Sequence, residues 1–177
     1  VLGPSDDPLT DHKGILAKYG LNSSFPEKVL KEANAIPEKV SSKEIKNRID
    51  SRNLFTVTID PLDARDFDDA LSIRKLSEKE WEIGVHIADV SNYVIRGSAL
   101  DREANKRGNS TYLVGEVVPM LPPRLSNGIC SLVEDEERLV KSVFFKISNV
   151  GEVLKSKICE SVIKSNKRLT YEQASLF

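Results

Sequence analysis

The feature that most constrains this chain is an acidic stretch that directly follows an apolar one. Residues 54–59, LFTVTI, predict a strand, and residues 60–69, DPLDARDFDD, contain five aspartates. Carboxylates this close together repel one another and are costly to desolvate as a group, so a folded site needs cations or water among them. We call residues 60–69 the acidic loop. It predicts either a cation site or a solvated acidic turn.

The sequence around the acidic loop predicts how it is held. The strand should end near Asp60, Pro61 should turn the chain out of it, and the chain should return into a strand at residues 70–73, ALSI. An EF-hand is excluded, because with Asp60 as its first position Arg65 falls where glycine is required and Leu71 where glutamate is required. Hard oxygen ligands on a short loop between strands instead suit Mg²⁺ or Mn²⁺.

The charge of the chain is unevenly distributed. Its net charge is −1, yet the acidic loop carries five aspartates and one arginine, and residues 141–168 carry seven Lys/Arg against two glutamates. This pattern fits a site that holds cations and receives a polyanion, although two oppositely charged solvated faces would give the same pattern.

Composition excludes several classes of protein. The chain has 177 residues, 40% hydrophobic and 30% charged, which suits one globular domain or part of a larger one. Cys130 and Cys159 are too few for a disulfide framework and predict a reducing, cytoplasmic setting. No apolar run approaches the ~20 residues of a membrane span, so no membrane partner is expected.

The hydrophobic pattern predicts a mixed α+β fold with largely antiparallel strands and helices packed around them. Ser24 is a candidate N-cap for a helix up to residue 36, with Pro26 in its first turn, and Ser41 with Glu44 predicts a capping box. Residues 1–14 suggest the end of a strand and a polar connection. Further predicted elements are a helix at 98–107, strands at 70–76 and 81–90, a hairpin formed by 138–148 and 152–165, and the start of a helix after residue 168.

Three motifs in this order make a specific pattern: TIDPLDARDFDDA, then VHIADVSNYV, then STYLVGEVVPMLPPRLSNGICSL. Together they resemble the RNB catalytic domain of the RNase II and RNase R family of exoribonucleases, and are closest to the RNase R branch. The resemblance implies processive 3′→5′ hydrolysis of single-stranded RNA to nucleoside 5′-monophosphates, with Mg²⁺ as cofactor and Mn²⁺ as a possible substitute.

The resemblance also implies a domain organisation. Residues 1–50 would be the tail of an upstream barrel and a helical linker, and residues 51–177 the N-terminal portion of a truncated RNB domain, with oligonucleotide-binding barrels flanking it in the full-length protein. Later family segments supply further residues near the scissile phosphate, so the 177-residue chain alone is expected to be inactive.

Site residues follow by resemblance. The family's catalytic and metal-binding aspartates fall on four positions, which we call the motif aspartates: Asp60, Asp66, Asp68 and Asp69. Asp60 and Asp69 are the first choices for direct metal ligands, and the other two would complete or support the site. Two cations would activate a water and stabilise the leaving 3′ oxygen. Tyr112 matches the tyrosine that contacts the terminal nucleotides of the RNA, whereas Asp63 lies outside the catalytic set.

Other candidates stay open. A structural or surface role is favoured for His86, Asp89 could reach the acidic loop, and Arg124 could meet a phosphate or be a plain surface residue. The lysines of the predicted hairpin would attract RNA if they face it. The alternative function is a non-catalytic RNA-binding or scaffold module that uses the acidic loop as a structural cation site.

Overall fold

The structure is a computed structural model that describes residue 3 and residues 8–176. Its helices are α1 (Pro8–Lys18), α2 (Glu27–Ala35), α3 (Ser42–Lys46), α4 (Ala99–Arg107) and α5 (Tyr171–Ala174), with a 3₁₀ turn at Val90–Asn92 and a π-helical turn at Leu125–Ile129. Its strands are β1 (Ile49–Asp50), β2 (Thr56–Asp60), β3 (Asp69–Ser77), β4 (Glu80–Ala88), β5 (Thr111–Leu113), β6 (Glu116–Val118), β7 (Glu137–Ser148), β8 (Val153–Lys164) and β9 (Lys167–Thr170).

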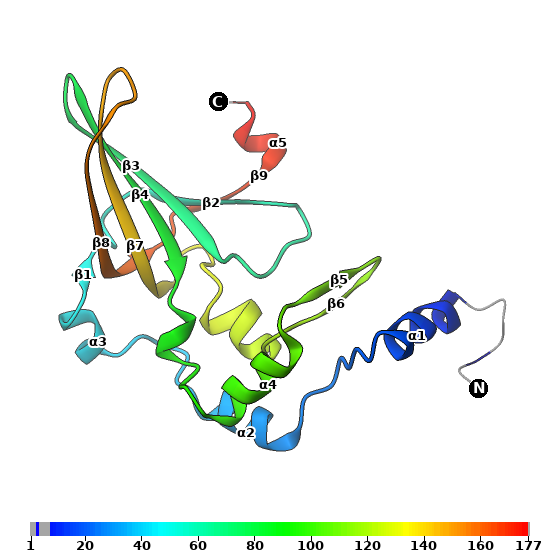
Figure 1. Cartoon of the computed structure of the whole chain (residues 1–177). Helices are drawn as coiled ribbons and strands as arrows, with labels where there is room; N and C mark the ends of the chain where they lie inside the picture. The colour runs from blue at the N-terminus through cyan, green and yellow to red at the C-terminus, as the bar shows by residue number, and fades with distance from the viewer. Residues whose placement is uncertain (1–2, 4–7, 177) are drawn as a thin grey trace.

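Seven strands form one mixed sheet in the order β1-β8-β7-β4-β3-β2-β9. The pairs from β8 through β2 are antiparallel, and only the outer pairs β1 with β8 and β2 with β9 are parallel. The strands β5 and β6 form a separate hairpin, and α2 and α4 lie together below the sheet (Figure 1). The predicted α+β class is confirmed.

The ends of the helices follow local sequence in most places. The capping box of α3 is present, because the side chain of Ser41 accepts from the Glu44 amide and the Glu44 carboxylate accepts from the Ser41 amide. The cap of α4 is also as predicted: Ser98 accepts from the amide of Asp101, and Gly108 ends the helix with φ of 80°.

Two predictions at the N-terminus are wrong. Ser24 does not cap α2, since Pro26 occupies the N-cap position and the Ser24 hydroxyl and amide donate to Asn22 Oδ1 instead. Helix α1 occupies part of the segment predicted as a polar connection, and the strand end predicted before that connection lies mostly outside the described residues.

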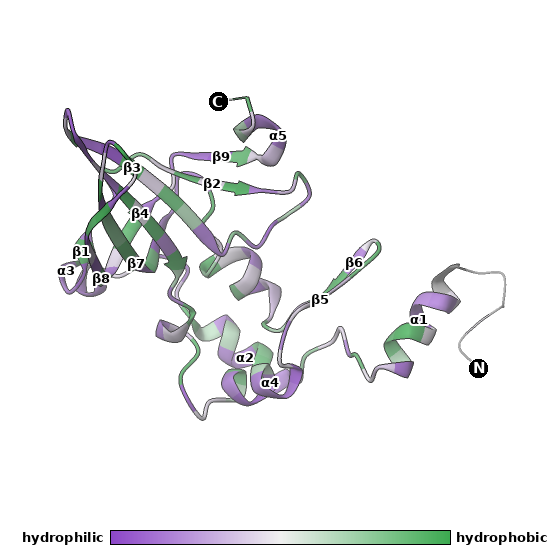
Figure 2. Cartoon of the chain, turned by 45° about the horizontal axis from the view of Figure 1, so that its top comes forward, coloured by the Kyte–Doolittle hydropathy of each residue, from purple (hydrophilic) through white to green (hydrophobic). Residues whose placement is uncertain are grey.

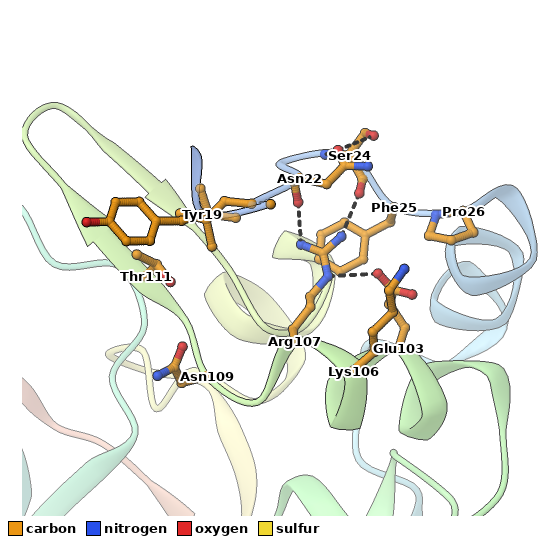
Figure 3. Close-up of a pocket in the computed structure, with 13 residues that line it drawn as sticks. Tyr19, Asn22, Ser24, Phe25, Pro26, Glu103, Lys106, Arg107, Asn109 and Thr111 are labelled. Carbon is orange, nitrogen blue, oxygen red and sulfur yellow. Dashed lines mark hydrogen bonds and ion pairs between the residues drawn. The ribbon is translucent and has the colours of Figure 1, made fainter. Parts of the chain in front are cut away.

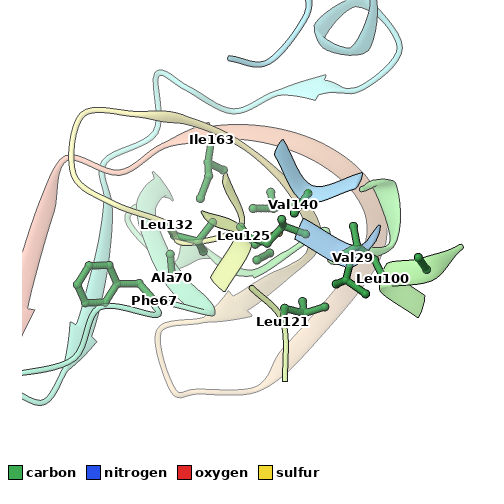
Figure 4. Packing of buried hydrophobic residues seen from close by; sticks show 13 residues of the cluster. Val29, Phe67, Ala70, Leu100, Leu121, Leu125, Leu132, Val140 and Ile163 are labelled. Atoms are coloured by element: carbon green, nitrogen blue, oxygen red, sulfur yellow. The ribbon is translucent and has the colours of Figure 1, made fainter. Parts of the chain in front are cut away.

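The hydrophobic core joins the lower end of the sheet to the helices. Leu100 of α4, Val29 of α2 and Leu125 of the π-helical turn are buried together, and Val140 of β7 and Ile163 of β8 cover them from the sheet (Figure 4). Full burial of side chains of this size contributes about 1.5–3 kcal/mol each. This core holds the end of the sheet at which β2 continues into the acidic loop.

The two faces of the sheet differ. On one face Thr58, Ser72 and His86 are buried, while Ile73 and Ile158 on the other face are exposed. The central strands carry hydrophobic stretches, and the tip between β3 and β4 is hydrophilic (Figure 2). Among the helices within residues 8–176, none has the length and apolar character needed to cross a membrane.

Candidate active site

The acidic loop connects two neighbouring antiparallel strands. Asp60 is the last residue of β2 and Asp69 is the first residue of β3, so the predicted placement of the loop between strand ends is confirmed. Pairing of Asp69 with Ile87 of β4 and of Asp60 with Thr170 of β9 fixes both ends of the loop in the sheet. The loop is therefore short and held at both of its ends.

The second half of the loop has its backbone groups bonded to other parts of the chain. The Ser131 hydroxyl donates to the Arg65 carbonyl at 2.8 Å and accepts from the Phe67 amide at 3.0 Å. The amide of Leu132 donates to the Phe67 carbonyl, and the amide of Ala88 donates to the Asp68 carbonyl. Satisfied backbone groups of this kind hold a loop without regular secondary structure in one conformation. The motif aspartates are thus presented from a fixed backbone.

The carboxylates of the loop influence one another. Burial raises the pKa of Asp60, and the charges of Asp69 and Asp66 raise it further. Burial also raises the pKa of Asp68, with added contributions from Asp66, Asp69 and Asp60. A cation would relieve this mutual repulsion. The motif aspartates therefore form one electrostatically coupled cluster, as the sequence predicts.

The Asp60 side chain bears on whether a cation fits the site. Its Oδ2 atom is buried and has no hydrogen-bond partner among the described residues. A buried, unpaired carboxylate oxygen is costly unless a metal or a proton satisfies it. Within the described part of the chain, no three His, Cys, Asp or Glu side chains are arranged so that they could hold a metal ion as they stand. The donor set fits Mg²⁺, but these residues do not by themselves form a complete coordination shell.

Tyr112 lies against the acidic loop. It sits on β5, and its hydroxyl donates to Asp66 Oδ2 at 2.5 Å. This bond, together with burial, raises the pKa of Tyr112 to about 12, so the phenol stays protonated at neutral pH. The residue is nevertheless 64% exposed, which leaves its ring accessible to a base. The structure brings together the tyrosine and the acidic motif, which lie more than 40 positions apart in the sequence.

His86 has a structural role, as expected. It is fully buried between Ser72 and Ser142, whose hydroxyls lie 2.9 and 2.7 Å from its ring nitrogens. Burial lowers its pKa to about 4, so the ring is neutral at physiological pH. His86 therefore connects β3, β4 and β7 and does not belong to the acidic cluster.

Asp89 and Arg124 are engaged elsewhere. Asp89 pairs with Arg48 at 2.7 Å, and their side chains are only 1% and 6% exposed, so Asp89 is committed to this pair rather than to the acidic loop. Arg124 donates to the carbonyls of Ala33 and Ile36, where α2 ends, and pairs with Glu38. Neither side chain is directed at the candidate active site.

The lysines of the β7–β8 hairpin are distributed over separate surroundings. Lys141 pairs with Glu160, Lys146 with Glu80, and Lys164 with Asp135. Lys155 and Lys157 line a groove of about 340 Å³ with Arg74 and Phe144. Arg74 of this groove lies five residues along β3 from Asp69. At ~3.3 Å per residue this separation is roughly 16 Å, so the groove is not directly beside the acidic loop.

A second pocket lies between the segment before α2 and the end of α4 (Figure 3). Arg107 stacks on Phe25 with 3.8 Å between the guanidinium carbon and the ring centroid, pairs with Glu103, and donates to the carbonyls of Asn22 and Ser24. The pocket has a volume of about 360 Å³ and contains none of the motif aspartates. Arg107 therefore fixes the upstream segment against the sheet-bearing part of the chain.

Sequence reasoning missed two residues that hold the acidic loop. Ser131 lies in the third motif without a sequence signal for its role, and Arg168 gives no signal beyond its positive charge. Their contacts with the loop come from more than 60 and more than 100 positions away in the sequence, and the folded structure is what reveals them.

Comparison with known proteins identifies the family. The family model for the RNB domain matches residues 48–177. The chain belongs to the RNB family. It is 52% identical over its full length to ribonuclease R of Thermotoga maritima, and 48% identical over 97% of its length to ribonuclease R 1 of Lactococcus lactis. The chain spans only 25% and 21% of the lengths of these two relatives.

Solved structures agree with this membership of the RNB family. The structure of Mycoplasma genitalium RNase R in complex with double-stranded RNA superimposes with a TM-score of 0.91 at 34% identity. The match covers 99% of this chain and 31% of the Mycoplasma chain. Yeast Ssd1, described as a pseudonuclease, shares the fold with a TM-score of 0.83 at 23% identity. Because one RNB-like neighbour is described as a pseudonuclease, the fold alone does not decide activity.

Proposed function

We propose that the protein containing this chain is a magnesium-dependent exoribonuclease that degrades single-stranded RNA processively in the 3′→5′ direction and releases nucleoside 5′-monophosphates. The observation that carries the proposal is the acidic loop. All four motif aspartates are present, the backbone of the second half of the loop is fixed by Ser131, Leu132 and Ala88, and Asp60 has a buried oxygen without a partner among the described residues.

The motif aspartates are the residues that would hold Mg²⁺, with Asp60 and Asp69 as the first choices for direct ligands. When bound, the metal would supply an activated water and would stabilise the charge on the leaving 3′ oxygen. Mn²⁺ would serve as a substitute because it prefers the same oxygen ligands.

The chain's own residues would position the RNA. The exposed ring of Tyr112 would stack on a terminal base, a contact worth roughly 1–3 kcal/mol that does not depend on sequence. The Tyr112 hydroxyl, which donates to Asp66, would keep that base next to the acidic loop. Oligonucleotide-binding barrels elsewhere in the full-length protein would deliver the strand, and the free thiols of Cys130 and Cys159 agree with a cytoplasmic location.

The experiment that tests the proposal uses the full-length protein and a 3′-labelled single-stranded RNA. We expect Mg²⁺-dependent release of labelled nucleoside 5′-monophosphate, no release in EDTA, and little release when the 3′ end is blocked. A protein that binds the RNA in Mg²⁺ without releasing nucleotides would instead support the alternative of a scaffold module with a structural cation site.

A further inference from the structure

Arg168 lies beside the acidic loop although more than 100 residues of sequence separate it from Asp60. Strand β9 runs parallel to β2 at the edge of the sheet, as seen in Figure 1. In this register Arg168 is opposite Thr58, and Thr170 is opposite Asp60. Parallel pairing therefore brings Arg168 to the point where β2 enters the loop.

The side chain of Arg168 contacts the loop on both sides of its midpoint. Its Nη2 atom donates to the carbonyls of Pro61 at 2.7 Å and Leu62 at 2.6 Å. Its guanidinium carbon lies 5.3 Å from the centroid of the Phe67 ring, and Phe67 is buried. One side chain thus connects the first two residues after β2 with the residue between Asp66 and Asp68.

These contacts hold the half of the loop that the rest of the chain holds least. The second half is bonded to Ser131, Leu132 and Ala88, whereas the Pro61 carbonyl otherwise accepts from the amide of Ala64, inside the loop itself. Hydrogen bonds from a charged donor are stronger than neutral ones. Beyond the pairing of Asp60 with Thr170, the side chain of Arg168 therefore ties the first half of the loop to the sheet.

The charge of Arg168 acts on the same site. It lowers the pKa of Asp60 and so opposes the effect of burial and of Asp69. Its Nε atom has no hydrogen-bond partner among the described residues, so a lysine at this position would lose no bond there. A lysine would keep the charge and could still donate to both carbonyls.

We propose that Arg168 is a positioning residue: it fixes the first half of the acidic loop, and with it Asp60, in the arrangement that the reaction requires. This inference rests on the proposed function, because the reaction in question is RNA hydrolysis at the motif aspartates. Arg168 acts through the loop and does not itself contact the reacting atoms.

The test compares Arg168→Met with the wild type in the full-length protein. Methionine keeps a flexible stem against Phe67 but has no charge and no donor. A misplacement of reacting groups by about 1 Å costs on the order of a hundredfold in rate. We therefore expect kcat in Mg²⁺ to fall about a hundredfold, KM for RNA to stay within about twofold, and Arg168→Lys to restore most of kcat.

Hydrogen exchange measured by mass spectrometry gives a readout that does not need activity. In Arg168→Met, amides of residues 62–67 should exchange faster, since the Ala64 amide donates to the carbonyl that Arg168 also binds. The matched control is Arg124→Met, which removes an arginine bonded to the carbonyls of Ala33 and Ile36. It should lower the melting temperature and leave kcat and exchange in 62–67 unchanged. Arg168→Gln replaces Arg168→Met, with the same expectations, if the latter does not fold.

The outcomes separate the two proposals. Wild-type kcat together with wild-type exchange in Arg168→Met overturns the positioning role. The positioning role is also overturned if Arg168→Met changes the affinity for Mn²⁺ but keeps the wild-type kcat, since that result would assign Arg168 a purely electrostatic effect. If the wild type itself releases no nucleotide, the proposed function fails. Hydrogen exchange in residues 62–67 of Arg168→Met, compared with the wild type, then still decides whether Arg168 fixes the loop.

Discussion

Replacing Asp68 by asparagine should change stability and activity in opposite directions. The Asp68 side chain is near three like charges, those of Asp66, Asp69 and Asp60, and burial raises its pKa as well. Pairs of partly exposed charges interact by about 0.2–1 kcal/mol each. Neutralising Asp68 should therefore raise the free energy of unfolding of the metal-free protein by about 1 kcal/mol.

The pH dependence gives the sign of this effect. Because the pKa of Asp68 is raised in the folded state, the ionised carboxyl destabilises the fold, and the penalty grows as pH rises through the range just above the ordinary pKa of aspartate. Below that range the group is protonated in both states and contributes nothing. The advantage of Asp68→Asn in urea denaturation should thus be present at pH 7 and disappear near pH 3.

The same substitution should lower turnover. Removing one group that stabilises the transition state costs about 10²–10³-fold in kcat. The assay is nucleotide release from single-stranded RNA by the full-length protein in Mg²⁺, with RNA affinity measured separately and expected to be unchanged. Asp63→Asn is the matched control, because Asp63 is exposed on the same loop and outside the motif aspartates. Near-normal turnover of Asp68→Asn would refute the assignment of the chemistry to this loop, and unfolding would show that Asp68 is structural.

Two further substitutions test other contacts. Asp89→Ala removes the carboxylate that pairs with the buried Arg48, which keeps its hydrogen bonds to Asn92 and the Val140 carbonyl, and should destabilise the protein by about 3 kcal/mol in urea denaturation. Burial alone would raise the pKa of Asp89, but its bonds with Ser91 and Arg48 hold the pKa below the ordinary value. The stability from this pair should therefore be lost as pH falls through that lowered pKa, and a difference that persists undiminished in strong acid would contradict the pairing. Tyr112→Phe keeps the ring and removes the bond to Asp66, so KM for RNA should stay within about twofold while kcat falls. Tyr112→Ala removes the ring and should weaken RNA binding by ~1–3 kcal/mol. Equal RNA affinity of the two variants would exclude stacking of a base on Tyr112.

Local sequence determined the elements whose causes are local. The acidic loop lies between two strands because apolar alternation ends at Asp60 and resumes at Ala70, and the box of Ser41 with Glu44 needs only three residues of spacing. The family resemblance was equally local, since its motifs are contiguous strings. These features depend on neighbours in the chain, which the sequence displays directly.

Tertiary structure decided which groups meet the loop and which face of each strand is buried. Alternation in β4 separates His86 from Ile87 but does not say which of them is inside. In the folded sheet His86 is buried between Ser72 of β3 and Ser142 of β7, whereas Ile87 is exposed. Arg168 and Ser131 reach the acidic loop only because β9 pairs in parallel with β2 and the π-helical turn packs under the sheet. Such contacts depend on how distant segments pair, and sequence spacing carries no information about that pairing.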